Sequence, residues 1–230
     1  MKKNSLLFVL LAAGFFCAAQ SPARDKPDSW TETLSYPDEK FNDVGRNTYF
    51  ILEPGHHLTL KGKATELVIT VLDETQDVNG VKTRVVEERE TAGGKLVEVS
   101  RNFFAVGEKT KNVYYFGEEV DIYKKDGTVI HEGAWREGRG DAKRGVLIPG
   151  TIKVGDCYYQ EKAPKVAMDR AENVSSEETV KTPAGEFKHC LKTKETTPIE
   201  SGTGYKFYAP GIGLVQDGDL KLVKHGFAKK

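Results

Sequence analysis

Hydrophobic and polar residues alternate along most of this chain, in runs separated by turn residues. The first clear run is "NTYFILEPGHHLTLKG", which starts at Asn47. The turn signals that follow are Pro54-Gly55, Asn79-Gly80, Gly93-Gly94, Asp126-Gly127, Pro183-Ala184-Gly185 and Asp217-Gly218. Asn-Gly, Asp-Gly and Gly-Gly suit two-residue hairpin turns, because the central residues need positive φ. The pattern therefore predicts a series of antiparallel strands joined by hairpins.

The hairpin around Asn79-Gly80 allows a test of register. Closing the chain there opposes three pairs of residues, which are Val78 and Val81, Asp77 and Lys82, and Thr75 and Arg84. The first pair is apolar and the second joins opposite charges, as expected of a real antiparallel ladder. We therefore expect a long hairpin with this register.

The later strands are also expected to be long. We place them at residues 95–106, 112–124, 128–135, 177–182, 186–196, 205–208, 213–216 and 220–224. Long twisted strands curl, so the predicted fold is mainly β, an antiparallel meander forming a strongly curved sheet or an open barrel. Few short helices are expected. "EGRGDAKRGVLIPG" is interpreted as a loop, and "APKVAMDRAENVSS" as a short helical turn or a loop.

The N-terminus has the pattern of a signal peptide. Lys2 and Lys3 precede an apolar stretch over residues 6–16, which is too short to span a bilayer. Cleavage is expected after Ala19, so residues 1–19 are a signal peptide and the protein is periplasmic or secreted. The alternative is a lipoprotein anchored through Cys17. Residues 20–45 are expected to be a flexible segment, residues 46–226 a single β domain, and residues 227–230 a tail.

Charge argues against two classes of partner. The chain has 230 residues with 34 basic and 34 acidic side chains, so its formal net charge is zero. No basic surplus attracts nucleic acid, and no transmembrane segment is expected after signal cleavage. The pattern leaves the oligomeric state open.

After removal of the signal peptide two cysteines remain, Cys157 and Cys190. A pair in an exported protein can form a disulfide. Two free, buried thiols are equally compatible with the pattern.

The segment from Val113 to Trp135, "VYYFGEEVDIYKKDGTVIHEGAW", concentrates aromatic and acidic residues around Asp126-Gly127. A two-residue turn there sorts them onto two faces. The apolar face is predicted to carry a ligand site formed by Tyr114, Phe116, Glu118, His131 and Trp135. Glu118 among aromatic residues would be a buried acid with a raised pKa. The alternative is that Gly117 forms a bulge that turns this carboxylate outward, or that a basic residue pairs with it.

The opposite face of the same hairpin is acidic. The two-residue turn places Asp121 opposite Glu132, with Glu119 nearby. Like charges directly opposite each other destabilise a sheet, so a calcium-like ion is one possible ligand there. The alternative is a solvated face neutralised by lysine and arginine. A second acidic group, Glu161, Asp169 and Glu172, is interpreted as a solvated loop.

The segments "YFILEPGHHLTLKG", "VYYFGEEVDIYKKDG", "HEGAW", "TPAGEFKHCLKTKETTPIE" and "KFYAPGIGLVQ" together resemble a family of exported bacterial proteins of unknown function. The resemblance runs from about Asn47 to Gly226 and implies an exported β-rich domain, without any assigned catalytic residue. The "TPAG-F" and "YAPGIGLV" elements also resemble lipoprotein-carrier-like half-barrels, at the level of fold.

These observations favour one function over two others. A curved sheet offers a concave apolar face, so the first hypothesis is a binding module for an apolar or lipid-like small molecule. The second is a structural or envelope-interaction domain. The third is a metal-assisted hydrolytic enzyme, for which no standard catalytic motif is present. No catalytic residue and no cofactor other than the calcium-like ion are predicted.

Overall fold

The computed structural model describes Trp30 and residues 38–228, and these residues form strands, turns and loops without a helix. The first strands are short and the next ones long: β1 (Phe41–Asn42), β2 (Gly45–Asn47), β3 (Phe50–Leu52), β4 (His56–Lys61), β5 (Thr65–Val78), β6 (Val81–Ala92), β7 (Lys95–Gly107) and β8 (Val113–Tyr123). The others are β9 (Val129–Ile130), β10 (Trp135–Arg136), β11 (Lys143–Ile148), β12 (Cys157–Tyr159), β13 (Glu161–Lys162), β14 (Arg170–Thr182), β15 (Gly185–Thr196), β16 (Gly204–Ala209), β17 (Gly213–Asp217) and β18 (Leu220–Phe227).

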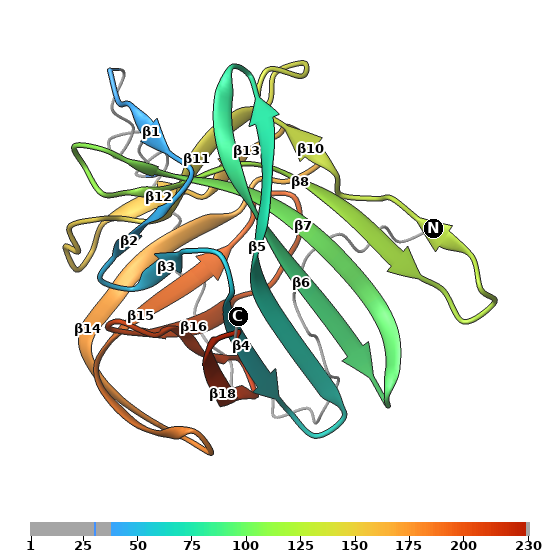
Figure 1. Cartoon of the computed structure of the whole chain (residues 1–230), viewed down its shortest axis with the longest axis vertical. Coiled ribbons are helices and arrows are strands. Elements are labelled where there is room, and N and C mark those ends of the chain that lie inside the picture. The colour runs from blue at the N-terminus through green and yellow to red at the C-terminus, as the bar shows by residue number, and fades with distance from the viewer. Residues whose placement is uncertain (1–29, 31–37, 229–230) are drawn as a thin grey trace.

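Thirteen of these strands form one antiparallel sheet, which is nearly closed into a barrel with one open seam (Figure 1). The order is β12-β14-β15-β16-β17-β18-β4-β5-β6-β7-β8-β11-β13. The end strands β12 and β13 are consecutive in the sequence, with only Gln160 between them. The chain therefore crosses the seam at Gln160. The predicted fold class, a mainly β meander forming an open barrel, is confirmed.

The hairpin at Asn79-Gly80 has the predicted register. Val78 pairs with Val81, Asp77 with Lys82, and Thr75 with Arg84. Asn79 and Gly80 both have positive φ, at 51° and 78°, as the turn requires. The strong local signal thus fixes a hairpin that extends beyond the barrel wall (Figure 1).

Two segments that we interpreted as loop or helix are strands. Lys143–Ile148 forms β11, which pairs with both β8 and β13. β14 begins at Arg170, several residues before the predicted start, because its first residues pair with β12 on one side and β15 on the other.

The two faces of the sheet carry separate apolar clusters. An inner cluster fills the barrel and includes Leu58, Leu67, Val86 and Leu214. An outer cluster lies on the opposite face and is formed by Val78, Val85, Phe103, Ala105, Tyr114, Phe116, Val146, Tyr158 and Ala171. Val85 and Val86 are neighbours in β6 and point to opposite faces, as strand geometry demands.

The N-terminal strand β1 covers the outer cluster. The ring of Phe41 packs edge-on against Tyr114 and Phe116, with ring centroids 5.2 Å apart in both pairs. Nearby, the buried Arg84 guanidinium pairs with Asp43 at 2.5 Å. These contacts explain why both faces of β8 are buried. The predicted signal peptide, Cys17 and most of the predicted flexible segment lie outside the described residues.

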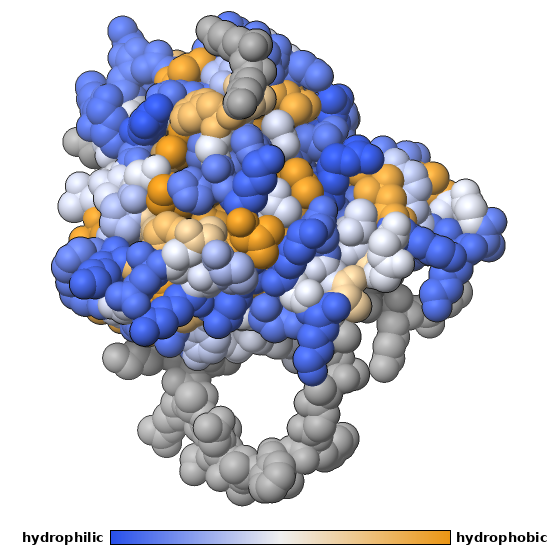
Figure 2. All heavy atoms as spheres, turned by 60° about the horizontal axis from the view of Figure 1, so that its bottom comes forward, coloured by the Kyte–Doolittle hydropathy of each residue, from blue (hydrophilic) through white to orange (hydrophobic). Residues whose placement is uncertain are grey.

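The surface shown in Figure 2 has apolar patches interrupted by hydrophilic residues. The large exposed apolar side chains come from separate parts of the chain, and are Val44, Val129, Val154, Val166, Ile199, Tyr205 and Phe227. Scattered apolar residues of this kind are ordinary on protein surfaces. Within residues 38–228 no helix is long and apolar enough to cross a membrane.

Candidate functional site

The barrel contains a partly open cavity of about 170 Å³. One part of its wall is apolar and is formed by Phe50, Ile51, Leu58, Leu67, Ile69, Val71, Val86, Phe104, Val120, Ile122, Leu147, Ala167, Ile212 and Leu214. These side chains come from strands on both sides of the barrel, which face one another because the sheet curls. An apolar cavity of this size matches the volume of an aromatic ring or a short alkyl chain.

The rest of the wall is polar and strongly acidic. It carries seven carboxyl groups, from Glu88, Glu98, Glu118, Glu161, Asp169, Glu195 and Asp217. Among the described residues of the wall, Lys206 is the one lysine or arginine. The cavity therefore combines an apolar region with an excess of acidic side chains.

Gly117 determines which residues of β8 face the cavity. The register between β7 and β8 shifts there: Phe104 pairs with Tyr115, while Phe103 pairs with Gly117. This is a β-bulge, and Gly117 has a φ of +151°. The extra residue changes the alternation, so Tyr115 faces inward before the bulge and Glu118 faces inward after it.

The bulge corrects the predicted ligand face. Tyr114 and Phe116 belong to the outer cluster, so the prediction that they share a face with Glu118 is wrong. The alternative in which a bulge turns Glu118 outward is also wrong, because Glu118 lines the cavity. Trp135 is buried and lies opposite Glu118 in the sheet, but it packs behind Tyr115 with ring centroids 5.2 Å apart. The inward aromatic residue of this strand is Tyr115.

Glu118 has a strongly altered acidity. Burial raises the pKa of Glu118 to about 8, and the nearby carboxyls of Asp169, Glu98 and Glu88 add to this effect. A hydrogen bond with Tyr115 opposes the rise in pKa. The Tyr115 hydroxyl has one hydrogen, which it can instead donate to Oδ1 of Asn102 at 2.6 Å. Glu118 is therefore protonated at neutral pH, as expected for a buried acid without a cation beside it.

Glu88 and Glu98 behave in the same way. Burial raises the pKa of each carboxyl to about 7, and each is further raised by neighbouring carboxyls. Lys206 opposes the rise in pKa at Glu88. These two groups titrate near neutral pH, so the charge of the cavity changes there.

Lys206 is held by two carboxylates on one side of the cavity. Its Nζ lies 2.9 Å from Oε2 of Glu195 and 4.0 Å from Oδ2 of Asp217. Burial alone would lower the pKa of Lys206, but attraction by Glu195 and Asp217 outweighs it and raises the pKa. Nε2 of Gln160, the residue at the seam, donates to Oε1 of Glu195 at 3.2 Å. This ion pair closes the wall beside the seam.

Glu161 and Asp169 also face the cavity, although we interpreted their segment as a solvated loop. Oε1 of Glu161 accepts a hydrogen bond from the backbone N–H of Asp169 at 2.6 Å. Burial raises the pKa of both carboxyls, to about 6 for Asp169. Glu172, the third member of the predicted cluster, lies in β14 within 3.8 Å of Lys194.

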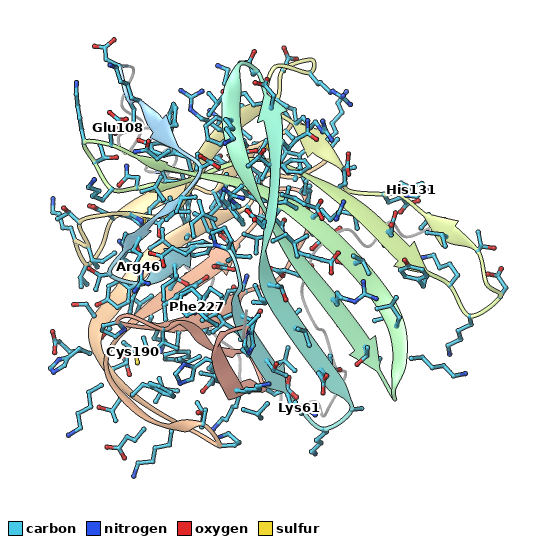
Figure 3. All side chains as sticks on the ribbon, in the orientation of Figure 1. Arg46, Lys61, Glu108, His131, Cys190 and Phe227 are labelled. Carbon is cyan, nitrogen blue, oxygen red and sulfur yellow. The ribbon has the colours of Figure 1, made fainter. Side chains whose placement is uncertain are left out.

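The hairpin at Asp126-Gly127 does not have its predicted register. Tyr123 pairs with Val129 instead of Ile130, so the turn contains three residues. β9 then ends at Ile130, and Asp121 contacts His131 at 2.8 Å instead of opposing Glu132. His131 lies on the outer arm of this hairpin, away from the cavity (Figure 3). The predicted opposition of Asp121 and Glu132 is wrong, because one extra turn residue shifts the pairing.

The third predicted metal ligand, Glu119, forms an ion pair with Arg136. Across residues 38–228 no group of three or more His, Cys, Asp or Glu side chains is arranged to hold a metal ion. On this face Arg136 pairs with Glu119 and His131 contacts Asp121, and the calcium-like ion stays a prediction.

Cys157 of β12 and Cys190 of β15 are not bonded to each other. Cys157 pairs with Glu172 of β14, whereas Cys190 of β15 pairs with Glu178 of β14. Six residues of strand separate these positions, which is roughly 20 Å at the usual rise per residue. A disulfide needs Cα atoms within about 7 Å, so the expected bridge between them is absent for geometric reasons.

Known proteins give little further guidance. The chain matches no protein-family model and no curated protein sequence. Among solved structures it is similar to a protein from Parabacteroides distasonis described as a "putative lipoprotein", with 14% sequence identity and a TM-score of 0.38. The match covers 79% of this chain and 100% of that chain. A similarity this distant supports no conclusion about function, and the predicted relationship to exported proteins of unknown function stays a prediction.

Proposed function

We propose that this protein is an exported binding module that encloses a small, mainly apolar or lipid-like molecule within its barrel. The observation that supports the proposal is the cavity of about 170 Å³, whose apolar wall comes from the inner faces of the central strands. Well-packed protein cores have few voids larger than a water molecule, because each void forfeits packing energy. A cavity of this size therefore suits a ligand site better than a purely structural core.

A cavity-filling substitution tests the proposal. Val86 is 1% exposed and lines the cavity, so Val86→Phe should occupy part of the ligand volume. Saturating toluene should raise the melting temperature of the wild-type protein by a few degrees, because a ligand bound only by the folded state stabilises it. In Val86→Phe this increase should be lost, as measured by circular dichroism during heating.

Two further variants control this experiment. Val154→Phe adds the same side chain at a position that is 55% exposed, and should keep the full response to toluene. Ala167→Leu fills the cavity from another side and remains informative if Val86→Phe does not fold. An equal response to toluene in the wild-type protein and both cavity variants would refute an interior site.

The exported location has a separate test, since it depends on the sequence of residues 1–19. Expression of the full chain in a bacterial host should yield an extracytoplasmic protein whose N-terminal residue is Gln20. N-terminal sequencing and intact mass measure this directly. A mature protein that begins at Cys17 and carries acyl chains would instead support the lipoprotein alternative, and an uncleaved cytoplasmic chain would refute export.

A further inference from the structure

Three carboxyls of the cavity form no ion pair within residues 38–228. Glu88, Glu98 and Glu118 line the wall, and no side chain of the described residues forms an ion pair with any of them. Lys206 is already engaged by Glu195 and Asp217. Buried charges in proteins are usually paired, so three unpaired carboxyls in one cavity are costly whenever they ionise.

The three side chains lie close together on neighbouring strands. Glu88 of β6 pairs with Ser100 of β7, and Glu118 of β8 pairs with Asn102 of β7. Glu98 is itself on β7. The three carboxyl-bearing residues therefore lie at the levels of Glu98, Ser100 and Asn102 along that strand. Alternate residues of a strand point to the same face and are about 7 Å apart. Glu98 and the level of Glu118 are two such steps apart, so a small group can contact Glu88 and Glu98 together, while Glu118 attracts it over a longer distance.

A second feature of the same wall also lacks a partner. Tyr208 is 4% exposed and lines the cavity, and no hydrogen bond joins its hydroxyl to another residue in the described part of the chain. The hydroxyl oxygen is not among the fully buried polar atoms that lack a partner, so it is accessible from the cavity. The charges of Glu195, Lys206 and Asp217 act on both Tyr208 and Glu88, which places the two residues at the same end of the cavity. A bound molecule with a polar group at this end would satisfy Tyr208.

We propose that the ligand is a cationic amphiphile, an organic amine whose ammonium group lies among Glu88, Glu98 and Glu118 while its alkyl or aryl part contacts the apolar wall. This inference rests on the proposed binding function and specifies its ligand class. The ammonium N–H groups donate to the carboxylates and to the Tyr208 oxygen, and charge-assisted hydrogen bonds of this kind are the strong ones. An organic amine fits better than a metal ion, because the carboxyls of the described residues are not grouped as metal ligands.

Matched ligands separate charge from apolar contact. n-Hexylamine and n-hexanol have the same alkyl chain and differ in the terminal group. Isothermal titration calorimetry at pH 7.5 with the full mature protein should show n-hexylamine binding at least about tenfold more tightly than n-hexanol. In Glu118→Gln the affinity for n-hexylamine should fall several-fold, while that for n-hexanol stays unchanged. Glu132→Gln, outside the cavity, should bind both molecules as the wild-type protein does.

The outcomes distinguish the two proposals. Equal or tighter binding of n-hexanol would overturn the amine proposal and leave the apolar binding function standing. Binding of neither molecule, together with no response to toluene, would overturn both. Displacement of n-hexylamine by millimolar calcium, with calcium binding abolished in Glu118→Gln, would overturn the amine proposal in favour of a metal site.

Discussion

The free protein should lose stability as the pH rises from 6.5 to 8.5. Burial raises the pKa of Glu118 to about 8 and those of Glu88 and Glu98 to about 7, above the ordinary value of 4.5. In this window the folded state holds protons that the unfolded state has already released, so the free energy of unfolding falls as pH rises. The summed effect is about 3 kcal/mol, or roughly 6–12 °C in melting temperature. Thermal unfolding at a series of pH values measures it.

Below pH 6.5 a histidine changes the free energy of unfolding in the opposite direction. Burial lowers the pKa of His56 to about 4 from an ordinary value of 6.5. Between these values the unfolded state binds more protons, so His56 makes the protein more stable as pH rises. Above pH 6.5 its remaining contribution is small, about 0.4 kcal/mol, so the carboxyls determine the slope.

Glu118→Gln should flatten the pH dependence by about half, because it removes the group with the highest of the three pKa values. Glu132→Gln changes an exposed glutamate of the same hairpin and should leave the slope unchanged. A melting temperature that is constant or rises between pH 6.5 and 8.5 would contradict the description of the cavity as an unpaired acidic wall.

Gly117→Ala should destabilise the protein by about 3 kcal/mol, because two effects combine. A Cβ at this position would lie 2.5 Å from the carbonyl oxygen of Trp135 and 2.9 Å from Cα of Arg136, and both are backbone atoms. The φ of +151° is also unfavourable for any residue with a side chain. Urea unfolding monitored by circular dichroism gives the free energy of unfolding.

Gly127→Ala is the matched control for this substitution. Its φ of +86° carries a similar backbone penalty, but a Cβ there meets nothing within 4 Å. We expect a loss of about 1 kcal/mol, from backbone strain alone. A loss in Gly117→Ala that is no larger than in Gly127→Ala would show that the bulge is not closely packed and does not fix the direction of Glu118.

The sequence predicts most of the strands because local signals are strong there. Asn79-Gly80 lies between alternating residues of opposite or matching character, and its register is correct to the residue. At Asp126-Gly127 the turn takes one residue more, since backbone N–H of Lys124 donates to Thr128 O. One residue is enough to bring Asp121 to His131, and no local feature distinguishes the two turns.

The site is harder to predict because its residues come from distant segments. Glu88, Glu98, Glu195 and Asp217 are separate in the sequence, and closure of the barrel brings them together. The sequence of β6 carries a weak signal of the acidic wall. Alternate residues of this strand face inward, and Glu88 follows Val86 in that alternation. Acidic residues at positions expected to face inward, on several neighbouring strands, indicate an acidic end of the cavity. The sequence indicates that Gly117 can form a bulge. Only the pairing of β8 with β7 shows that the Glu118 side chain still faces the cavity after it.

Methyl NMR during a ligand titration tests most directly whether a molecule binds inside the barrel. With n-hexylamine, the methyl signals of Leu58, Leu67 and Val86 should shift, because these residues line the cavity. The signals of Val85 and Val146 should stay in place, since they belong to the outer cluster. Shifts confined to the outer cluster or to exposed residues, or no shift at a saturating concentration, would contradict an interior binding site.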